Sequence, residues 1–221
     1  MTETLTRTPG SWDLIRIPAM ITLVVTVLRL IGELQHWSHF WFNPQPGGGG
    51  ALIGIVWLVP IFGVYFALKL KGMGETPKVG RTIGFIAIGL LVIVGGMILA
   101  NAIIHERLMF IITANLIAGV GGLIQLYGWP SLSKILMAYG FAARIPVALV
   151  MFFAIRGNWG THYDLPPPEF PQIGWFSKFV IIGLLPQLLL WVTFTMIIGA
   201  LAGAIAVAIA RKRTPALQPS S

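Results

Sequence analysis

Six long apolar segments decide what this chain of 221 residues can fold into. An α-helix needs about 20 mainly apolar residues to cross the hydrocarbon core of a bilayer. Six segments reach roughly this length, at residues 14–35, 51–70, 82–104, 108–127, 135–155 and 179–210. They are apolar on every face, without the alternation that is typical of an outer-membrane barrel. The sequence therefore predicts an all-α, polytopic integral membrane protein with six transmembrane helices.

The composition agrees with a chain that is built to meet lipid. Charged residues make up 10% of it, whereas soluble domains carry about 25%. Cysteine is absent, which excludes disulfides, iron–sulfur clusters and thiol nucleophiles. The first apolar segment has no small-residue cleavage site after it, so we interpret it as a retained helix and not as a signal peptide. We expect a cytoplasmic segment at 1–13, a transmembrane domain at 14–210 and a disordered cytoplasmic tail at 211–221.

The distribution of positive charge predicts the orientation. The formal net charge is +8, but most basic residues lie at the ends of apolar segments, where they indicate topology and not nucleic-acid binding. With the N-terminus inside, the outer segments hold three basic residues, Arg107, Arg156 and Lys178. The cytoplasmic segments hold ten: Arg7, Arg16, Lys69, Lys71, Lys78, Arg81, Lys134, Arg211, Lys212 and Arg213. Both termini are therefore predicted to be cytoplasmic, in a chain of the inner membrane whose partner is the lipid bilayer.

Arg144 is the candidate for a binding residue because it falls near the middle of the fifth apolar segment. An arginine at that depth costs roughly 2.5–3.5 kcal/mol on insertion scales, so its guanidinium needs partners inside the bundle. Counting residues along the helices puts Asn115 and Gln187 at a similar depth, and both side-chain carbonyls could accept from Arg144. The alternative is that Arg144 binds helices together through carbonyls and that the two amides are ordinary interhelical bonds.

Three prolines are expected at the same level: Pro60, Pro146 and Pro186. Each removes one helical hydrogen bond and frees a carbonyl. Freed carbonyls at membrane depth are tolerated when they meet protein donors or line a wet cavity. A polar, kinked midplane is how many transporters build a substrate site. This pattern predicts a polar cavity in which Arg144 binds or excludes a charged solute.

Two further pairs are interpreted as structural. Arg29 and Glu33 are spaced i, i+4 near the outer end of the first helix, so an ion pair would reduce the cost of burying both. Gly199 and Gly203 form a GxxxG pattern in the last segment. Small residues at this spacing let helices approach closely, within one chain, in a homo-oligomer or against a partner membrane subunit.

A second candidate site lies on the predicted outer face. His36 and His39 are spaced i, i+3, which would place both rings on one side of a helix. Together with His162 and Asp164 they could bind zinc or another divalent ion, or act in general acid–base catalysis. Histidines also suit a membrane interface without any such role, and no established metal motif is present. The sequence identifies no cofactor.

Three classes of function therefore stay open. The first is a small transporter or channel-like protein with a polar midplane around Arg144. The second is a membrane enzyme or metal-binding protein that works at the outer leaflet through its histidines. The third is a non-catalytic membrane subunit or lipid-interacting scaffold, in which the buried polar groups serve packing alone. We favour the first by a narrow margin, because an ionisable residue inside a membrane is by default a hypothesis of a functional site.

Overall fold

The computed structural model describes residues 10–46, 53–168 and 170–212, and within these ranges it is helical without strands. The helices are α1 (Ser11–Leu34), α2 (Leu58–Gly72), α3 (Val79–Ile103), α4 (Arg107–Ile124), α5 (Pro130–Gly157), α6 (Trp175–Lys178) and α7 (Trp191–Lys212). A 3₁₀ turn, η2 (Gln125–Tyr127), follows α4. Two π-helical segments, η3 (Phe179–Leu184) and η4 (Pro186–Leu190), join α6 to α7.

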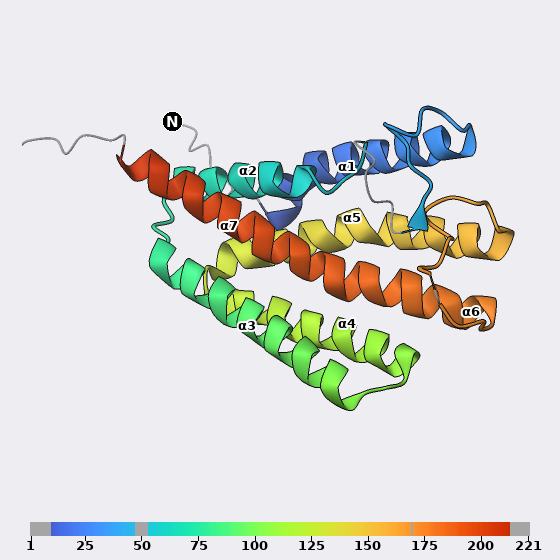
Figure 1. Ribbon diagram of the computed structural model, residues 1–221. Coiled ribbons are helices and arrows are strands. Elements are labelled where there is room, and N and C mark those ends of the chain that lie inside the picture. The colour runs from blue at the N-terminus through green and yellow to red at the C-terminus, as the bar shows by residue number, and fades with distance from the viewer. Residues whose placement is uncertain (1–9, 47–52, 169, 213–221) are drawn as a thin grey trace, which may run out of the picture.

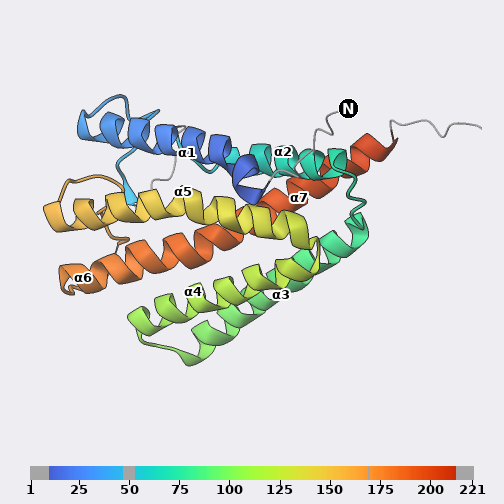
Figure 2. The same cartoon turned by 180° about the vertical axis from the view of Figure 1, so that it is seen from behind.

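The helices run roughly along one axis in an elongated bundle (Figures 1 and 2). α1 and α2 lie along one side, α5 and α7 run through the middle, and the α3–α4 hairpin lies along the opposite side. The last turn of α7 lies at the same end as the end of α2 and the start of α3, which we call the terminal end. The connections after α1, α3 and α5 are at the opposite, far end.

Among the residues that the structure describes, five helices are long and apolar enough to cross a membrane: Trp12–Leu34, Val79–Ile103, Arg107–Tyr127, Pro130–Gly157 and Trp175–Ala210. Their outward side chains are large and apolar, and Leu91 and Ile98 of α3 are 71% and 67% exposed. Such surfaces are stable next to acyl chains and not next to water. By the length and composition of its helices, the chain is a multi-pass membrane protein.

The second predicted segment, 51–70, differs from expectation. Residues 51–52 lie outside the described part of the chain, 53–57 form turns, and the helix begins only at Leu58. At 1.5 Å per residue, the 15 residues of α2 span about 22 Å, less than the roughly 30 Å of a hydrocarbon core. A sixth spanning helix is therefore not confirmed.

The start of α2 explains why Pro60 does not break a helix. Pro60 is the third residue of α2, and the backbone N–H groups of the first helical turn have no intrahelical acceptor in any case. The prediction of a mid-helix kink at Pro60 is therefore wrong. Before it, the N–H groups of Leu58 and Val59 donate to the carbonyls of Ile55 and Val56 in tight turns.

Pro146 does lie inside a helix, in the middle of α5. Pro186 opens the second π-helical segment of the last crossing, and Leu185 separates it from the first. A proline lacks the N–H that would close a regular helical hydrogen bond, and single π turns in α-helices occur frequently at functional sites. The last crossing is thus wider than a regular α-helix where it passes Arg144.

The predicted GxxxG contact is confirmed within the chain. Gly199 and Gly203 of α7 face Gly63 and Ala67 of α2 so closely that a Cβ on Gly63 would collide with the backbone of Gly199. A Cβ added to Gly203 would meet that of Ala67 at 2.7 Å. These small residues allow α2 and α7 to pack backbone to backbone, as in other membrane bundles.

An aromatic core packs at the level of this contact, where α2 meets α5. Phe62 and Phe66 of α2 pack edge-on against Tyr139 of α5, with ring centroids 5.4 and 5.6 Å apart. The Tyr139 hydroxyl shares a hydrogen bond of 2.8 Å with Oγ1 of Thr22, which fixes α1 against α5. We call Phe62, Phe66 and Tyr139 the aromatic plug.

Candidate functional site

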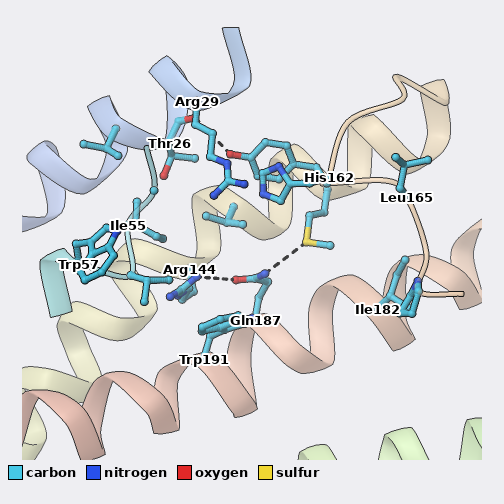
Figure 3. Close-up of a pocket in the computed structure, with 17 residues that line it drawn as sticks. Thr26, Arg29, Ile55, Trp57, Arg144, His162, Leu165, Ile182, Gln187 and Trp191 are labelled. Carbon is cyan, nitrogen blue, oxygen red and sulfur yellow. Dashed lines mark hydrogen bonds between the residues drawn. The ribbon is translucent and has the colours of Figure 1, made fainter. Parts of the chain in front are cut away.

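A cavity of about 420 Å³ lies between α1, residues 54–57, α5, the loop after α5 and the last crossing. Figure 3 shows that side chains from all of these elements meet around it. Two arginines, Arg29 of α1 and Arg144 of α5, line it together with Gln187 and aromatic rings. A cavity of this size can hold a small organic molecule.

Arg144 is the central polar group of the cavity. Its side chain is buried, with 4% of the residue exposed, and Nη1 donates a long hydrogen bond of 3.5 Å to Oε1 of Gln187. The guanidinium carbon lies 4.6 Å from the centre of the Trp191 ring, in cation–π geometry. Nε and Nη2 have no hydrogen-bond partner within the described part of the chain. The guanidinium is thus positioned but incompletely paired.

The elements around Arg144 explain its position. Gln187 belongs to η4, directly after Pro186, and its Nε2 donates to Sδ of Met151 at 3.5 Å. This contact turns Oε1 of Gln187 toward Arg144 (Figure 3). Trp191 begins α7 one turn later and supports the guanidinium from below in Figure 3.

Arg29 is the second cation of the cavity and is paired differently. Its Nε donates to Oε1 of Glu33 at 2.9 Å, so the predicted i, i+4 ion pair is present. The carboxylate of Glu33 is fully buried and also accepts from the backbone N–H of His162 at 3.0 Å. A Cβ added to Gly54 would lie 3.0 Å from Nη1 of Arg29, so the missing side chain of this glycine leaves room for the guanidinium.

The loop after α5 lines the far end of the cavity. Asp164 holds a tight turn, because its carboxylate accepts from the backbone N–H groups of Gly160 and Thr161 and from the Thr161 hydroxyl at 2.8–3.0 Å. Tyr163 then reaches α1, where its hydroxyl donates to the carbonyl of Thr26 at 3.4 Å. With the bond from His162 to Glu33, the loop is attached to α1 at two points.

His162 lines the cavity at this attachment. Its Nδ1 lies 2.6 Å from Oε1 of Glu33. Burial lowers the pKa of His162 below its ordinary value, although the neighbouring carboxylate of Glu33 acts in the opposite direction. Burial likewise raises the pKa of Tyr163. Both side chains are therefore neutral near pH 7, and His162 does not balance or add to the charge of the two arginines.

The cavity is electropositive as a result. No aspartate or glutamate is among its lining residues, all of which lie in the described part of the chain. Glu33 neutralises Arg29 from behind, whereas no acidic side chain accompanies Arg144 among the described residues. A buried cation without a counter-charge favours binding of an anion, because the low-dielectric surroundings strengthen the attraction.

The structure brings together only part of the predicted Arg144 site. Gln187 accepts from Arg144 as expected, but Asn115 does not. Asn115 donates to the carbonyl of Ile111 in its own helix at 2.8 Å, and it is not among the cavity residues. The prediction is wrong here because residue counting gives the depth of a side chain but not the side of the helix from which it projects.

The predicted metal site has no counterpart. Across residues 10–46, 53–168 and 170–212, no three histidine, aspartate or glutamate side chains are grouped closely enough to hold a metal ion. His36 and His39 lie on the exposed connection after α1, which ends at Leu34, so the helical spacing does not apply to them. Asp164 uses both carboxylate oxygens within its own loop. Of the four residues, His162 alone lines the cavity.

Sequence reasoning missed the aromatic walls of the site. Trp57, Tyr163 and Trp191 all line the cavity, but tryptophan and tyrosine are also typical of membrane interfaces and gave no separate signal. The position of Trp191 near the level of Arg144, one turn after Gln187, was the one indication available.

No protein-family model, no curated protein and no solved structure matches this chain. The fold and the cavity therefore define its class on their own. It is a multi-pass, all-helical membrane protein with a buried, incompletely paired arginine in a cavity between its helices.

Proposed function

We propose that this protein binds an organic anion inside the membrane and moves it across, as a small transporter. The observation that carries the proposal is Arg144, whose Nε and Nη2 are buried beside a cavity without hydrogen-bond partners among the described residues. A carboxylate or phosphate would accept from both atoms in the forked geometry that guanidinium groups favour.

The second crossing supports the proposal. We infer that residues 53–72 complete a sixth crossing as a broken helix, with both termini of the chain in the cytoplasm. Non-helical backbone at membrane depth is tolerated where it lines a cavity, and residues 54–57 do line this one. Broken helices beside a midplane site are how many secondary transporters hold their substrates.

The test is transport by the purified protein in liposomes, with a panel of radiolabelled carboxylates and phosphates. Arg144→Leu should abolish the uptake of any anion that the wild type transports. Arg156→Leu is the matched control, because it removes the same charge from the exposed end of the same helix. Uptake that persists in Arg144→Leu would remove Arg144 from the mechanism, and a wild type without flux would favour the scaffold class.

His162 favours a second candidate function. A histidine that faces a cavity and lies 2.6 Å from a carboxylate resembles the base and orienting acid of hydrolytic enzymes. On this alternative, His162 activates water against an anionic ester held by the arginines. Release of inorganic phosphate from a phosphate monoester, lost in His162→Gln, would support hydrolysis over transport.

A further inference from the structure

The walls of the cavity indicate which kind of anion it accepts. Around the guanidinium groups the lining is largely apolar, with Ile55, Val147, Met151 and Ile182 among its members. A small hydrophilic anion would leave these walls uncovered. A molecule with one anionic head and one apolar tail would pair with Arg144 and cover the walls at the same time.

Protein elements border the cavity at both ends of the bundle. At the far end, Leu165 and Pro167 of the attached loop lie over it, and Tyr163, which is 3% exposed, fastens that loop to α1. Toward the terminal end, the aromatic plug fills the space between α1, α2 and α5. Protein groups thus lie between the cavity and both ends of the bundle.

At the side of the bundle, two residues that line the cavity are exposed on the outer surface. Val56 and Trp57 line the cavity and are nevertheless 39% and 62% exposed. They lie where the turns before α2 pass α1, and these two helices touch at few places. The cavity wall therefore reaches the outer surface of the bundle at Val56 and Trp57, which we call the side opening.

The depth of the side opening in the membrane decides whether it faces acyl chains or water. Leu58 lies 14 residues before Gly72, the last residue of α2, and Arg144 lies 14 residues after Pro130, the first residue of α5. Both positions are therefore about 21 Å along their helices. The side opening lines the same cavity as Arg144, and Arg144 is near the middle of the 28-residue helix α5, which is longer than a hydrocarbon layer about 30 Å thick requires. In a bilayer that the bundle crosses, the molecules next to the side opening would be acyl chains.

We propose that the ligand of this site is a single-chain anionic amphiphile, with a carboxylate or phosphate head, which enters from the bilayer through the side opening. This inference rests on the proposed function, because it assigns the substrate class of the same cavity. The head pairs with Nε and Nη2 of Arg144, and the tail lies along the apolar walls and leaves past Trp57 into the bilayer.

The absence of cysteine allows the side opening to be blocked selectively. Val56→Cys would be made and modified with a bulky maleimide in phosphatidylcholine nanodiscs, with the unmodified variant as reference. Met20→Cys is the matched control, since Met20 is 65% exposed on the lipid side of α1 and is not a cavity residue. Binding of dodecyl phosphate, dodecanoate and inorganic phosphate would be measured on each sample.

We expect the wild type to bind at least one dodecyl anion, and Arg144→Met to weaken that binding at least tenfold. Modification of Val56→Cys should weaken it at least tenfold as well, and modification of Met20→Cys should leave it within twofold. The stronger of the two dodecyl ligands identifies the head group as phosphate or carboxylate.

Other outcomes separate the two proposals. If inorganic phosphate binds as tightly as the dodecyl anions and its binding is insensitive to labelling of the Val56→Cys variant, the amphiphile and its sideways route are overturned while the anion site stands. If dodecyl binding survives the bulky label, the route through the side opening is wrong. If no anion depends on Arg144, the proposed function itself fails.

Discussion

Arg144→Met should stabilise the ligand-free protein while it removes anion binding. Two buried guanidinium nitrogens have no partner among the described residues, and each unsatisfied donor costs about 1–3 kcal/mol. The substitution gives up the long bond to Gln187 and the cation–π contact with Trp191, which are worth together about 1–3 kcal/mol. Methionine keeps much of the volume, so we expect a net gain of about 1–3 kcal/mol, within the range measured when buried charges are replaced.

Thermal unfolding in detergent measures this gain. For a chain of this size, a gain of about 2 kcal/mol corresponds to roughly 4–8 °C in Tm. Arg156→Met is the control and should leave Tm nearly unchanged, because that side chain is exposed at the far end of α5. A Tm that falls by several degrees in Arg144→Met would show that the arginine binds the helices together. The reasoning that makes it an unpaired binding group would then be refuted.

Three further substitutions follow from the same geometry. Arg29→Met should lower the free energy of unfolding by about 3–5 kcal/mol, because it leaves the buried carboxylate of Glu33 without its cation; an unchanged Tm contradicts this. Gly63→Val should cost about 1–3 kcal/mol through overpacking against α7, whereas Gly95→Ala, which meets no atom within 4 Å, should be harmless. Burial lowers the pKa of His162, so the unfolded chain binds more protons between that pKa and the ordinary value near 6.5. Stability should therefore fall as the pH is lowered through this window, and His162→Gln should flatten the slope of Tm against pH.

The spanning helices could be predicted from the sequence because their stability is local. In a bilayer each helix must satisfy its own backbone, so apolar length alone defines α1, α3, α4, α5 and the last crossing to within a few residues. The start of α2 could not be predicted this way. Residues 53–57 are as apolar as the helix that follows, and their turns depend on distant contacts, such as the bond from the N–H of Ile53 to the carbonyl of Trp41.

For the candidate site, the sequence predicted how deep each residue lies along its helix but not the direction in which its side chain projects. Arg144 and Gln187 were found because both are polar residues in apolar helices, and they do meet. Asn115 has the same signal and projects elsewhere. The contact between Glu33 and His162 joins residues 129 positions apart, and no local pattern in the sequence indicates it.

The cavity exists because the second crossing is not a continuous helix: the turns before α2 form part of its wall. The Gly63–Gly199 contact holds α2 tightly against α7, so the chain before α2 must cross the remaining depth next to α1 and α5. A regular helix there would present side chains on every side. The turns at 54–57 instead present Gly54 to the guanidinium of Arg29, which keeps that cation beside the cavity and leaves room next to Arg144. The close packing of Gly63 against Gly199 thus fixes where α2 begins beside α7, and with it the position of the turns that line the cavity.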